Sequence, residues 1–170
     1  MSLDARPTLV EQGGKSDKVN GLFLQTDLSR ATKRGHLTTV QFLVEHLGAD
    51  IEKANIHGWT PLHYVAWRGH LEVARYLLGK GAQTNKASNV GGWNPLHYAV
   101  YHGHLDVAKL LITHGAHLNA RTNAGYLPID IALTEEIRQA IRDEPRRRRD
   151  RCRGGLKTSK HLPSNTAAVV

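Results

Sequence analysis

The sequence contains little cysteine and few aromatic residues, and it has no long hydrophobic run. One of its 170 residues is cysteine, Cys152, so an internal disulfide bond is excluded. No run of about 18 apolar residues occurs, and we therefore expect no transmembrane helix. The segment Met1–Lys18 lacks the apolar region of a secretory signal. These absences favour a protein of the cytoplasm or the nucleus.

The net charge of +8 is concentrated near the C-terminus. Residues 145–160 hold eight Lys or Arg side chains and one Asp, which leaves about +1 for the rest of the chain. We interpret residues 144–170 as a basic, disordered tail. Its arginine run consists of Arg146, Arg147, Arg148, Arg149, Arg151 and Arg153.

The stretch Trp59–Leu71 occurs again, little changed, as Trp93–Leu105. Both copies contain Pro-Leu-His-Tyr followed by Gly-His-Leu, and their prolines are 34 residues apart. A fixed period of this size indicates a repeat array. The pattern resembles the ankyrin repeat, which has a length of about 33 residues and a Thr-Pro-Leu-His signature. The resemblance implies an all-α solenoid of stacked helix-turn-helix units that are connected by β-turn fingers.

We expect four repeats, of which the first and last are atypical caps. The first lacks Thr-Pro-Leu-His, and the last lacks the Gly-His turn and ends at Asp143-Glu144-Pro145. Residues 1–20 are interpreted as a disordered N-terminal segment. An aromatic content of 6% suits such an array, because each repeat buries only the faces of its neighbours. The predicted ankyrin domain covers 21–143, with repeats at 21–55, 56–88, 89–122 and 123–143.

Several signature residues have structural roles. In the two full repeats, proline suits the first helical position and is preceded by a capping residue, Thr60 or Asn94. The resemblance implies that His63 and His97 form hydrogen bonds within and between repeats. Eleven histidines raise the possibility of a metal site, but no set of four ligands is evident. We therefore expect no metal and no cofactor.

The side chains that this architecture does not require are mostly aromatic or basic. The resemblance places them on the concave face of the inner helices and on the fingers, where the family binds protein partners. Tyr, Trp and Arg are also the types enriched at interface hot spots. The alternative is that some of them pack against neighbouring repeats, with Tyr64 and Tyr98 the first candidates. The predicted protein-binding residues are Lys33, Arg34, Trp59, Tyr64, Trp67, Arg68, Trp93, Tyr98, Tyr101, His102 and Tyr126.

The function that these observations favour is a protein-binding adaptor or scaffold. We expect no catalysis, because no phosphate loop, nucleophile elbow or metal-helix motif occurs. The alternative is a nuclear or nucleic-acid-associated protein whose arginine run contacts an import receptor or, without specificity, polyanions. We expect a monomer without membrane association. Four repeats form a short array, which leaves open that the chain is a piece, an isoform or a divergent copy of a longer protein.

Overall fold

Helix pairs follow one another along the chain. The computed structural model describes residues 27–154, with side chains described as far as Glu144. The predicted N-terminal segment 1–20 and the end of the predicted tail, 155–170, lie outside the described residues, as do 21–26. No strand occurs within the described part of the chain, which confirms the all-α prediction. After a first helix at residues 27–34 come α2 (Leu37–Glu45), α3 (Pro61–Arg68), α4 (Leu71–Gly79), α5 (Pro95–Tyr101), α6 (Leu105–Thr113) and α7 (Glu135–Gly154).

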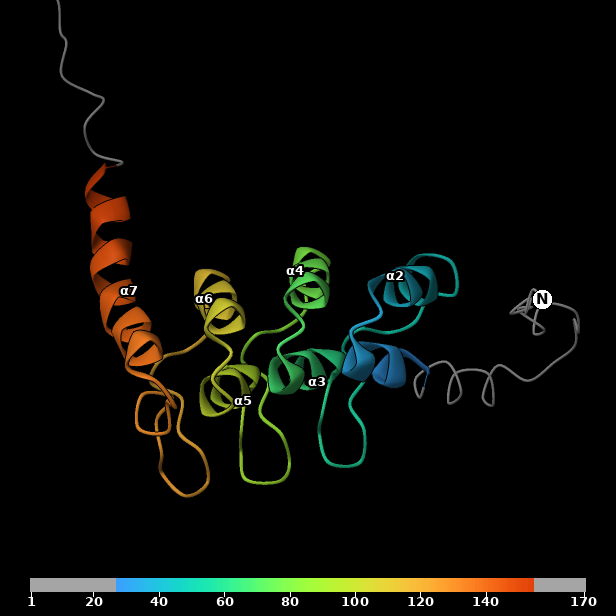
Figure 1. Cartoon of the computed structure of the whole chain (residues 1–170), viewed down its shortest axis with the longest axis horizontal. Helices are drawn as coiled ribbons and strands as arrows, with labels where there is room; N and C mark the ends of the chain where they lie inside the picture. Colours follow the sequence, from blue (N-terminus) through green and yellow to red (C-terminus); the bar gives the residue numbers. More distant parts are fainter. Residues whose placement is uncertain (1–26, 155–170) are drawn as a thin grey trace, which may run out of the picture.

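The helices form two rows, as Figure 1 shows. The helix at 27–34, α3 and α5 lie side by side and are called the inner helices below. The second row consists of α2, α4 and α6, the outer helices, each following its inner partner after a short turn. The fingers extend from the inner row on the side away from the outer row (Figure 1). The last helix, α7, packs beside α6 and closes the array.

The inner helices begin where the sequence predicts. Pro61 and Pro95 occupy the first positions of α3 and α5, where a missing N–H leaves no hydrogen bond unmade. The Asn94 amide oxygen accepts a hydrogen bond from the backbone N–H of His97 at 3.0 Å. In return, the backbone N–H of Asn94 donates to His97 Nδ1 at 3.3 Å. Such a reciprocal cap satisfies two backbone donors at the start of the helix.

The core is a column of apolar side chains that runs between the repeats. Leu62 and Leu96 of the inner helices are 1% and 0% exposed, and Leu77 and Leu111 of the outer helices are fully buried. One apolar face of each outer helix is thus packed against adjacent repeats. Each such leucine contributes about 1.5–3 kcal/mol to folding. The array is therefore stabilised chiefly by contacts between repeats.

The glycine between the two helices of a repeat contacts the histidine at the same turn of the next repeat, as at Gly35 and His70 and at Gly69 and His104. Gly69 joins α3 to α4 with a φ of 79°, a conformation that favours glycine. The ring of His104, from the next repeat, lies directly against it, and a Cβ at position 69 would be 2.5 Å from Nδ1 of that ring. His104 Nε2 is 3.1 Å from the carbonyl oxygen of Trp67. The glycine is needed both for its backbone conformation and for the space that the histidine fills.

The fourth repeat is shortened, and its last helix is longer than the sequence predicted. Residues 128–131 form a single turn instead of an inner helix. Thr134 caps the start of α7, because its Oγ1 accepts a hydrogen bond from the backbone N–H of Ile137 at 3.4 Å. The prediction that the helix ends at Asp143-Glu144-Pro145 is wrong, since α7 continues to Gly154. Proline removes one helical hydrogen bond, but the arginines that follow it are good helix formers.

Candidate functional site

Six aromatic rings of the inner helices and fingers form one continuous surface, which we call the aromatic ladder. Trp59 lies at its centre, with ring centroids 5.2 Å from Tyr64, 5.7 Å from Trp67 and 4.6 Å from Tyr98. Since Tyr98 belongs to the next repeat, this last contact joins two repeats. The ladder consists of Trp59, Tyr64, Trp67, Trp93, Tyr98 and Tyr101.

Trp93 repeats this arrangement one unit further along the array. Its ring centroid lies 5.2 Å from Tyr98 and 5.3 Å from Tyr101, and the Trp93 and Tyr101 rings meet edge to face at 82°. Tyr98 contacts both tryptophans and so connects the two halves of the ladder. Edge-to-face pairs of this kind stabilise by about 0.5–1.5 kcal/mol beyond their buried area. The ladder therefore supports the fold as well as forming a surface.

Two cations lie over the ring of Trp67. The guanidinium carbon of Arg68 is 4.0 Å from the ring centroid, and Nζ of Lys33, from the preceding repeat, is 5.6 Å from it. Both distances are within the range of a cation–π interaction. Arg34 is exposed at the end of the same inner helix as Lys33. We call Lys33, Arg34 and Arg68 the cationic cluster.

The tyrosines that follow the signature histidines are partly buried and connect to the fingers. The Tyr64 hydroxyl accepts a hydrogen bond from Nδ2 of Asn55 at 2.8 Å, and the Tyr98 hydroxyl is 3.4 Å from Ser88 Oγ. Burial raises the pKa of Tyr98. These contacts support the packing alternative for Tyr64 and Tyr98 among the predicted binding residues.

The exposed part of the predicted site is smaller than the sequence indicated. Tyr101 is 51% exposed and Tyr126 is 54% exposed, whereas Trp59, Trp67 and Trp93 are half-buried. His102 is exposed, and its ring lies 6.3 Å from Trp67 and 5.1 Å from Tyr101. Tyr126 is on the last finger, and within the described residues no ring contact connects it to the ladder. The structure thus brings most predicted residues together and leaves Tyr126 apart.

The histidines of this region differ in environment. His63 is fully buried, and burial lowers its pKa to about 4. Its Nδ1 accepts a hydrogen bond from the Thr60 N–H at 3.1 Å, so its Nε2–H donates to the Trp93 carbonyl at 3.3 Å. This confirms the expected bonds within and between repeats. Partial burial, assisted by the charges of His104 and Arg68, lowers the pKa of His102.

His97 confirms only half of its expected role. It forms the hydrogen bonds to Asn94 within its repeat. Its Nε2 forms no hydrogen bond of normal length among the described residues, although the backbone of Tyr126, in the next repeat, is near enough to oppose the lowering of the His97 pKa by burial. In the last repeat, Asp130 takes the equivalent place and accepts a hydrogen bond from the Leu127 N–H at 2.9 Å. The sequence showed that aspartate replaces histidine here, and the structure preserves its capping role.

Charge is distributed unequally between the two rows of helices. The inner helices contain four basic side chains and one acidic side chain, whereas the outer helices contain two basic and three acidic ones. The outer Glu45 pairs with Lys80 of the next repeat at 3.0 Å. Among the described residues, no ion pair involves Lys33, Arg34 or Arg68. The cationic cluster is therefore available to a negatively charged ligand.

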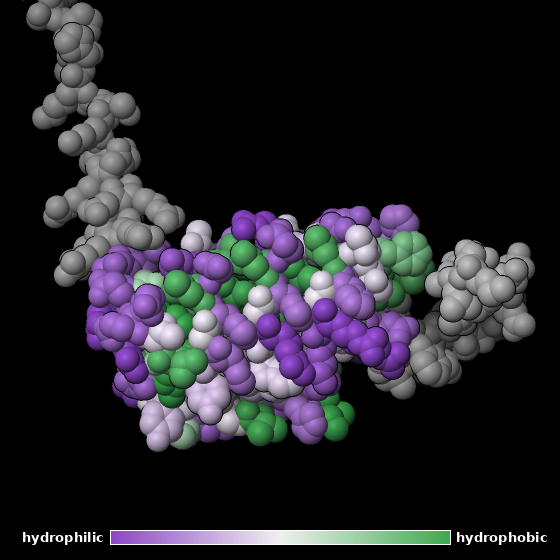
Figure 2. Space-filling model, viewed as in Figure 1, coloured by the Kyte–Doolittle hydropathy of each residue, from purple (hydrophilic) through white to green (hydrophobic). Residues whose placement is uncertain are grey.

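The finger tips present apolar side chains that the sequence analysis missed. Ile56 is 88% exposed and Val90 is 62% exposed. Figure 2 shows apolar surface along the lower edge, where the fingers end. Neighbouring fingers are joined by backbone bonds, such as the one from the Asn89 N–H to the His57 carbonyl at 2.9 Å. A large apolar residue one or two positions before a turn glycine was the sequence signal that could have predicted these exposed side chains.

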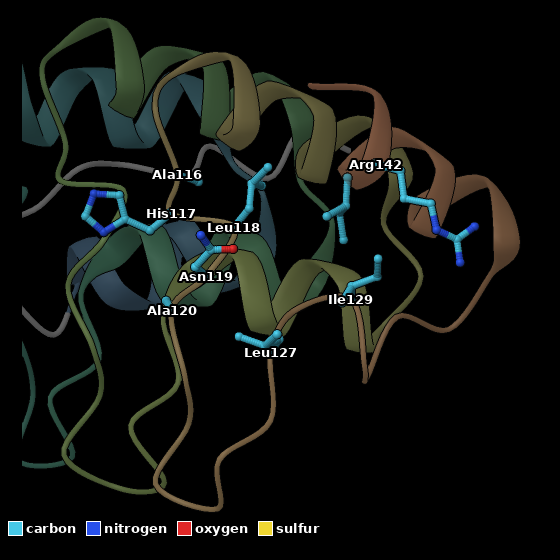
Figure 3. Close-up of a pocket in the computed structure, with 9 residues that line it drawn as sticks. Ala116, His117, Leu118, Asn119, Ala120, Leu127, Ile129 and Arg142 are labelled. Atoms are coloured by element: carbon cyan, nitrogen blue, oxygen red, sulfur yellow. The ribbon is translucent and has the colours of Figure 1, made fainter. Parts of the chain in front are cut away.

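One cavity in the described region lies away from these residues. It has a volume of about 550 Å³ and opens between the loop after α6, the last finger and α7 (Figure 3). Its walls are mainly apolar and include Leu118, Leu127 and Ile129. Arg142 is at its edge, but the guanidinium pairs with Glu135 at 2.7 Å. No cluster of reactive side chains converges on this cavity.

The described residues contain neither a metal-binding group nor a membrane-spanning helix. No group of three or more His, Cys, Asp or Glu side chains is placed to hold a metal ion there. No helix in the described part of the chain has both the length and the apolar character required to cross a bilayer. The predicted tail arginines, Arg146–Arg153, lie in the part of α7 whose side chains are outside the described residues.

Comparison with known families gives the chain its place. The family model described as "Ankyrin repeats (3 copies)" matches residues 7–89, 28–122 and 85–141, which together cover most of the sequence. The chain belongs to the ankyrin repeat family. Ankyrin repeats are generally non-catalytic modules for protein–protein interaction. No match was found among curated proteins.

Proposed function

We propose that this ankyrin repeat protein is an adaptor that binds a protein partner across the inner helices and finger tips. The observation that carries the proposal is the ladder of six aromatic rings, bordered by cations, on the inner helices and fingers. Tryptophan, tyrosine and arginine contribute large contact areas at low entropic cost and dominate protein interfaces. The finger tips add Ile56 and Val90 as exposed apolar contacts.

The chain offers a matched pair of variants that tests this proposal. Tyr101 of inner helix α5 and Phe42 of outer helix α2 are 51% and 50% exposed. We expect Tyr101→Ala to remove specific partners in affinity capture from cells and Phe42→Ala to retain them. Each substitution should change the free energy of unfolding by less than about 1 kcal/mol, because both side chains are half exposed. Equal capture by the two variants would contradict the proposal.

Trp67→Ala extends the test to a half-buried ring. This substitution removes the indole ring over which Arg68 and Lys33 lie. We expect Trp67→Ala to lose the same partners, together with a moderate loss of stability. Thermal unfolding measured on the same sample separates these effects. A chain that unfolds at the capture temperature would instead support a purely structural role for Trp67.

A further inference from the structure

Two members of the cationic cluster, Lys33 and Arg68, lie against a ring of the protein and form no ion pair within the described residues. Arg68 and Lys33 come from adjacent repeats and both lie over the Trp67 ring, at 4.0 Å and 5.6 Å. The ring restricts the motion of both side chains and leaves their charges unneutralised. No carboxylate of the described residues forms an ion pair with either of them. Such an arrangement is complementary to an anionic ligand.

The charged side chains of this surface are concentrated at one end of the array. Its cations belong to the first two repeats, where the inner helices carry Arg30, Lys33, Arg34 and Arg68. Among these four, and counting described residues alone, only Arg30 forms an ion pair, with Asp27 at 3.7 Å. The inner helix of the third repeat, α5, carries no charged Asp, Glu, Lys or Arg side chain. There the exposed side chains are aromatic, as at Tyr101. The surface therefore changes along the array from basic to apolar and aromatic.

The geometry of the rings favours a peptide over a nucleic acid. Bases bind to protein by stacking on open, flat ring faces. Here Arg68 covers one face of Trp67, while Trp59 meets Trp67 edge to face at 78° and is tilted by 57° on Tyr98. The rings form a half-buried wall of edges and tilted faces. Such a wall suits aliphatic and aromatic side chains of a peptide.

Resting on the proposed function, we infer that the partner segment is an acidic peptide whose two ends differ in character. Its Asp or Glu side chains bind Lys33, Arg34 and Arg68 over the first two repeats. Its apolar side chains pack on Trp67, Trp93 and Tyr101 over the second and third. Carboxylates specify the position of the peptide, and the aromatic wall supplies most of the buried area.

A subtractive peptide selection tests this inference on the full chain. A random-peptide display library is selected on the wild-type protein and then depleted on the Lys33→Glu/Arg68→Glu double variant. Because the double variant retains Arg146–Arg153, the depletion removes peptides that bind only the basic tail. Both substituted side chains are exposed, so we expect the variant to fold. Lys33→Gln/Arg68→Gln provides a second variant without added negative charge.

We expect the remaining peptides to carry an excess of Asp and Glu near one end and apolar residues near the other. Selected peptides are then synthesised with Glu or Gln at the acidic positions. Since all three tryptophans of the chain belong to the ladder, intrinsic tryptophan fluorescence reports binding at this surface. The Gln versions and the Arg68→Glu variant should each weaken binding by about tenfold or more. The control Arg75→Glu, on outer helix α4, should change it less than about twofold.

Three outcomes would overturn the inference, and they separate it from the proposed function. Peptides without an acidic excess that still require Tyr101 would refute the acidic partner and leave the adaptor function intact. Peptides that bind the Tyr101→Ala and wild-type chains equally well would refute both. If oligouridylate displaces the acidic peptides from the ladder at equal concentration, the surface is one for nucleic acid. Loss of acidic-peptide binding as ionic strength rises from about 0.1 M to about 1 M would support the inference.

Discussion

The junction between the second and third repeats differs from the junction between the third and fourth. At the first of these, His63 bonds the carbonyl of Trp93 and His104 bonds the carbonyl of Trp67. At the second, His97 Nε2 forms no hydrogen bond of normal length among the described residues, although the Tyr126 backbone is near it, and Leu133 takes the place of a histidine beside Gly103. Backbone bonds remain there, such as that from the Leu133 N–H to the Val100 carbonyl at 3.0 Å.

This contrast shows how the array ends. An internal repeat must match a neighbour of its own kind, and its histidines specify the register by directional bonds. The last repeat meets no further repeat within the described residues, and α7 covers its core with Ile137 and Ile141. Apolar burial requires less exact geometry than hydrogen bonds do. The terminal junction should therefore depend on α7, and the internal junction on its histidines.

The largest effect on the free energy of unfolding is expected from a substitution at Ile137, which is fully buried in α7. Ile137→Ala should lower the free energy of unfolding by about 3 kcal/mol, from lost burial and the cavity that remains. The midpoint of urea denaturation measures the change. Leu133→Ala is the control, since Leu133 is 63% exposed and should cost less than about 1 kcal/mol. Equal effects at the two positions would show that α7 does not hold this junction.

The second-largest effect on stability is expected when acid protonates the internal junction. Burial lowers the pKa of His63 to about 4 in the folded protein, from 6.5 in the unfolded chain. The unfolded state therefore binds more protons between these values, and stability falls as pH decreases from about 6.5 toward 4. We expect a loss of about 2 kcal/mol between about pH 7 and pH 5, measured by urea denaturation.

His63→Asn provides the control for this pH dependence. The variant removes the proton-binding group, so the slope of stability against pH should become smaller. A residual slope of the same sign is expected, because burial also lowers the pKa of His97 and of His102. An unchanged slope would contradict the assignment of the acid effect to His63.

Two glycines with the same backbone conformation allow a direct comparison of the junctions. Gly69 and Gly103 both have a φ of 79°. An added Cβ would be 2.5 Å from the His104 ring at Gly69 and 2.9 Å from the end of exposed Leu133 at Gly103. Because the Leu133 side chain can move aside, Gly103→Ala should cost about 1 kcal/mol and Gly69→Ala nearer 2 kcal/mol. Thermal denaturation of both variants shows which substitution destabilises the protein more. A larger loss of stability for Gly103→Ala would refute the idea that the His104 ring restricts the space at Gly69.

The smallest effect is expected when one junction is made to resemble the other. His104→Leu puts at the internal junction the residue type that lies beside Gly103. The Trp67 carbonyl loses its bond at 3.1 Å, and we expect a cost of about 1 kcal/mol. Chemical denaturation measures it, with Leu133→His as the reciprocal variant. If neither variant changes the free energy of unfolding, the hydrogen bond from His104 does not stabilise the junction.

Most of the repeat structure could be predicted because the residues that build it act locally. The cap at Asn94, the proline at position 95 and the turn at Gly69 each depend on a few neighbours in sequence. The end of α7 could not be predicted in this way, because a proline signals termination and the arginines beyond it favour a helix. The two signals oppose each other, and local rules do not say which is stronger.

The candidate site was predictable in its residues but not in its contacts. The period of 34 residues placed Trp67 and Tyr101 at equivalent positions of inner helices. It did not show that Lys33 reaches the Trp67 ring from the preceding repeat, or that Trp59 packs on Tyr98 of the next one. Both contacts cross a repeat boundary, and their distances depend on how the repeats stack.

The sequence by itself determined that this chain is a stack of helix pairs, because the spacing of proline, histidine and glycine within each repeat specifies local geometry. Only the tertiary structure decided which aromatic side chains remain exposed and which support the stack. Exposure is a property of the assembled neighbours: Trp67 is half-buried, whereas Tyr101, at the equivalent position of the next repeat, is 51% exposed. The same assembly sets two cations over one ring, and no carboxylate in the described part of the chain pairs with either of them.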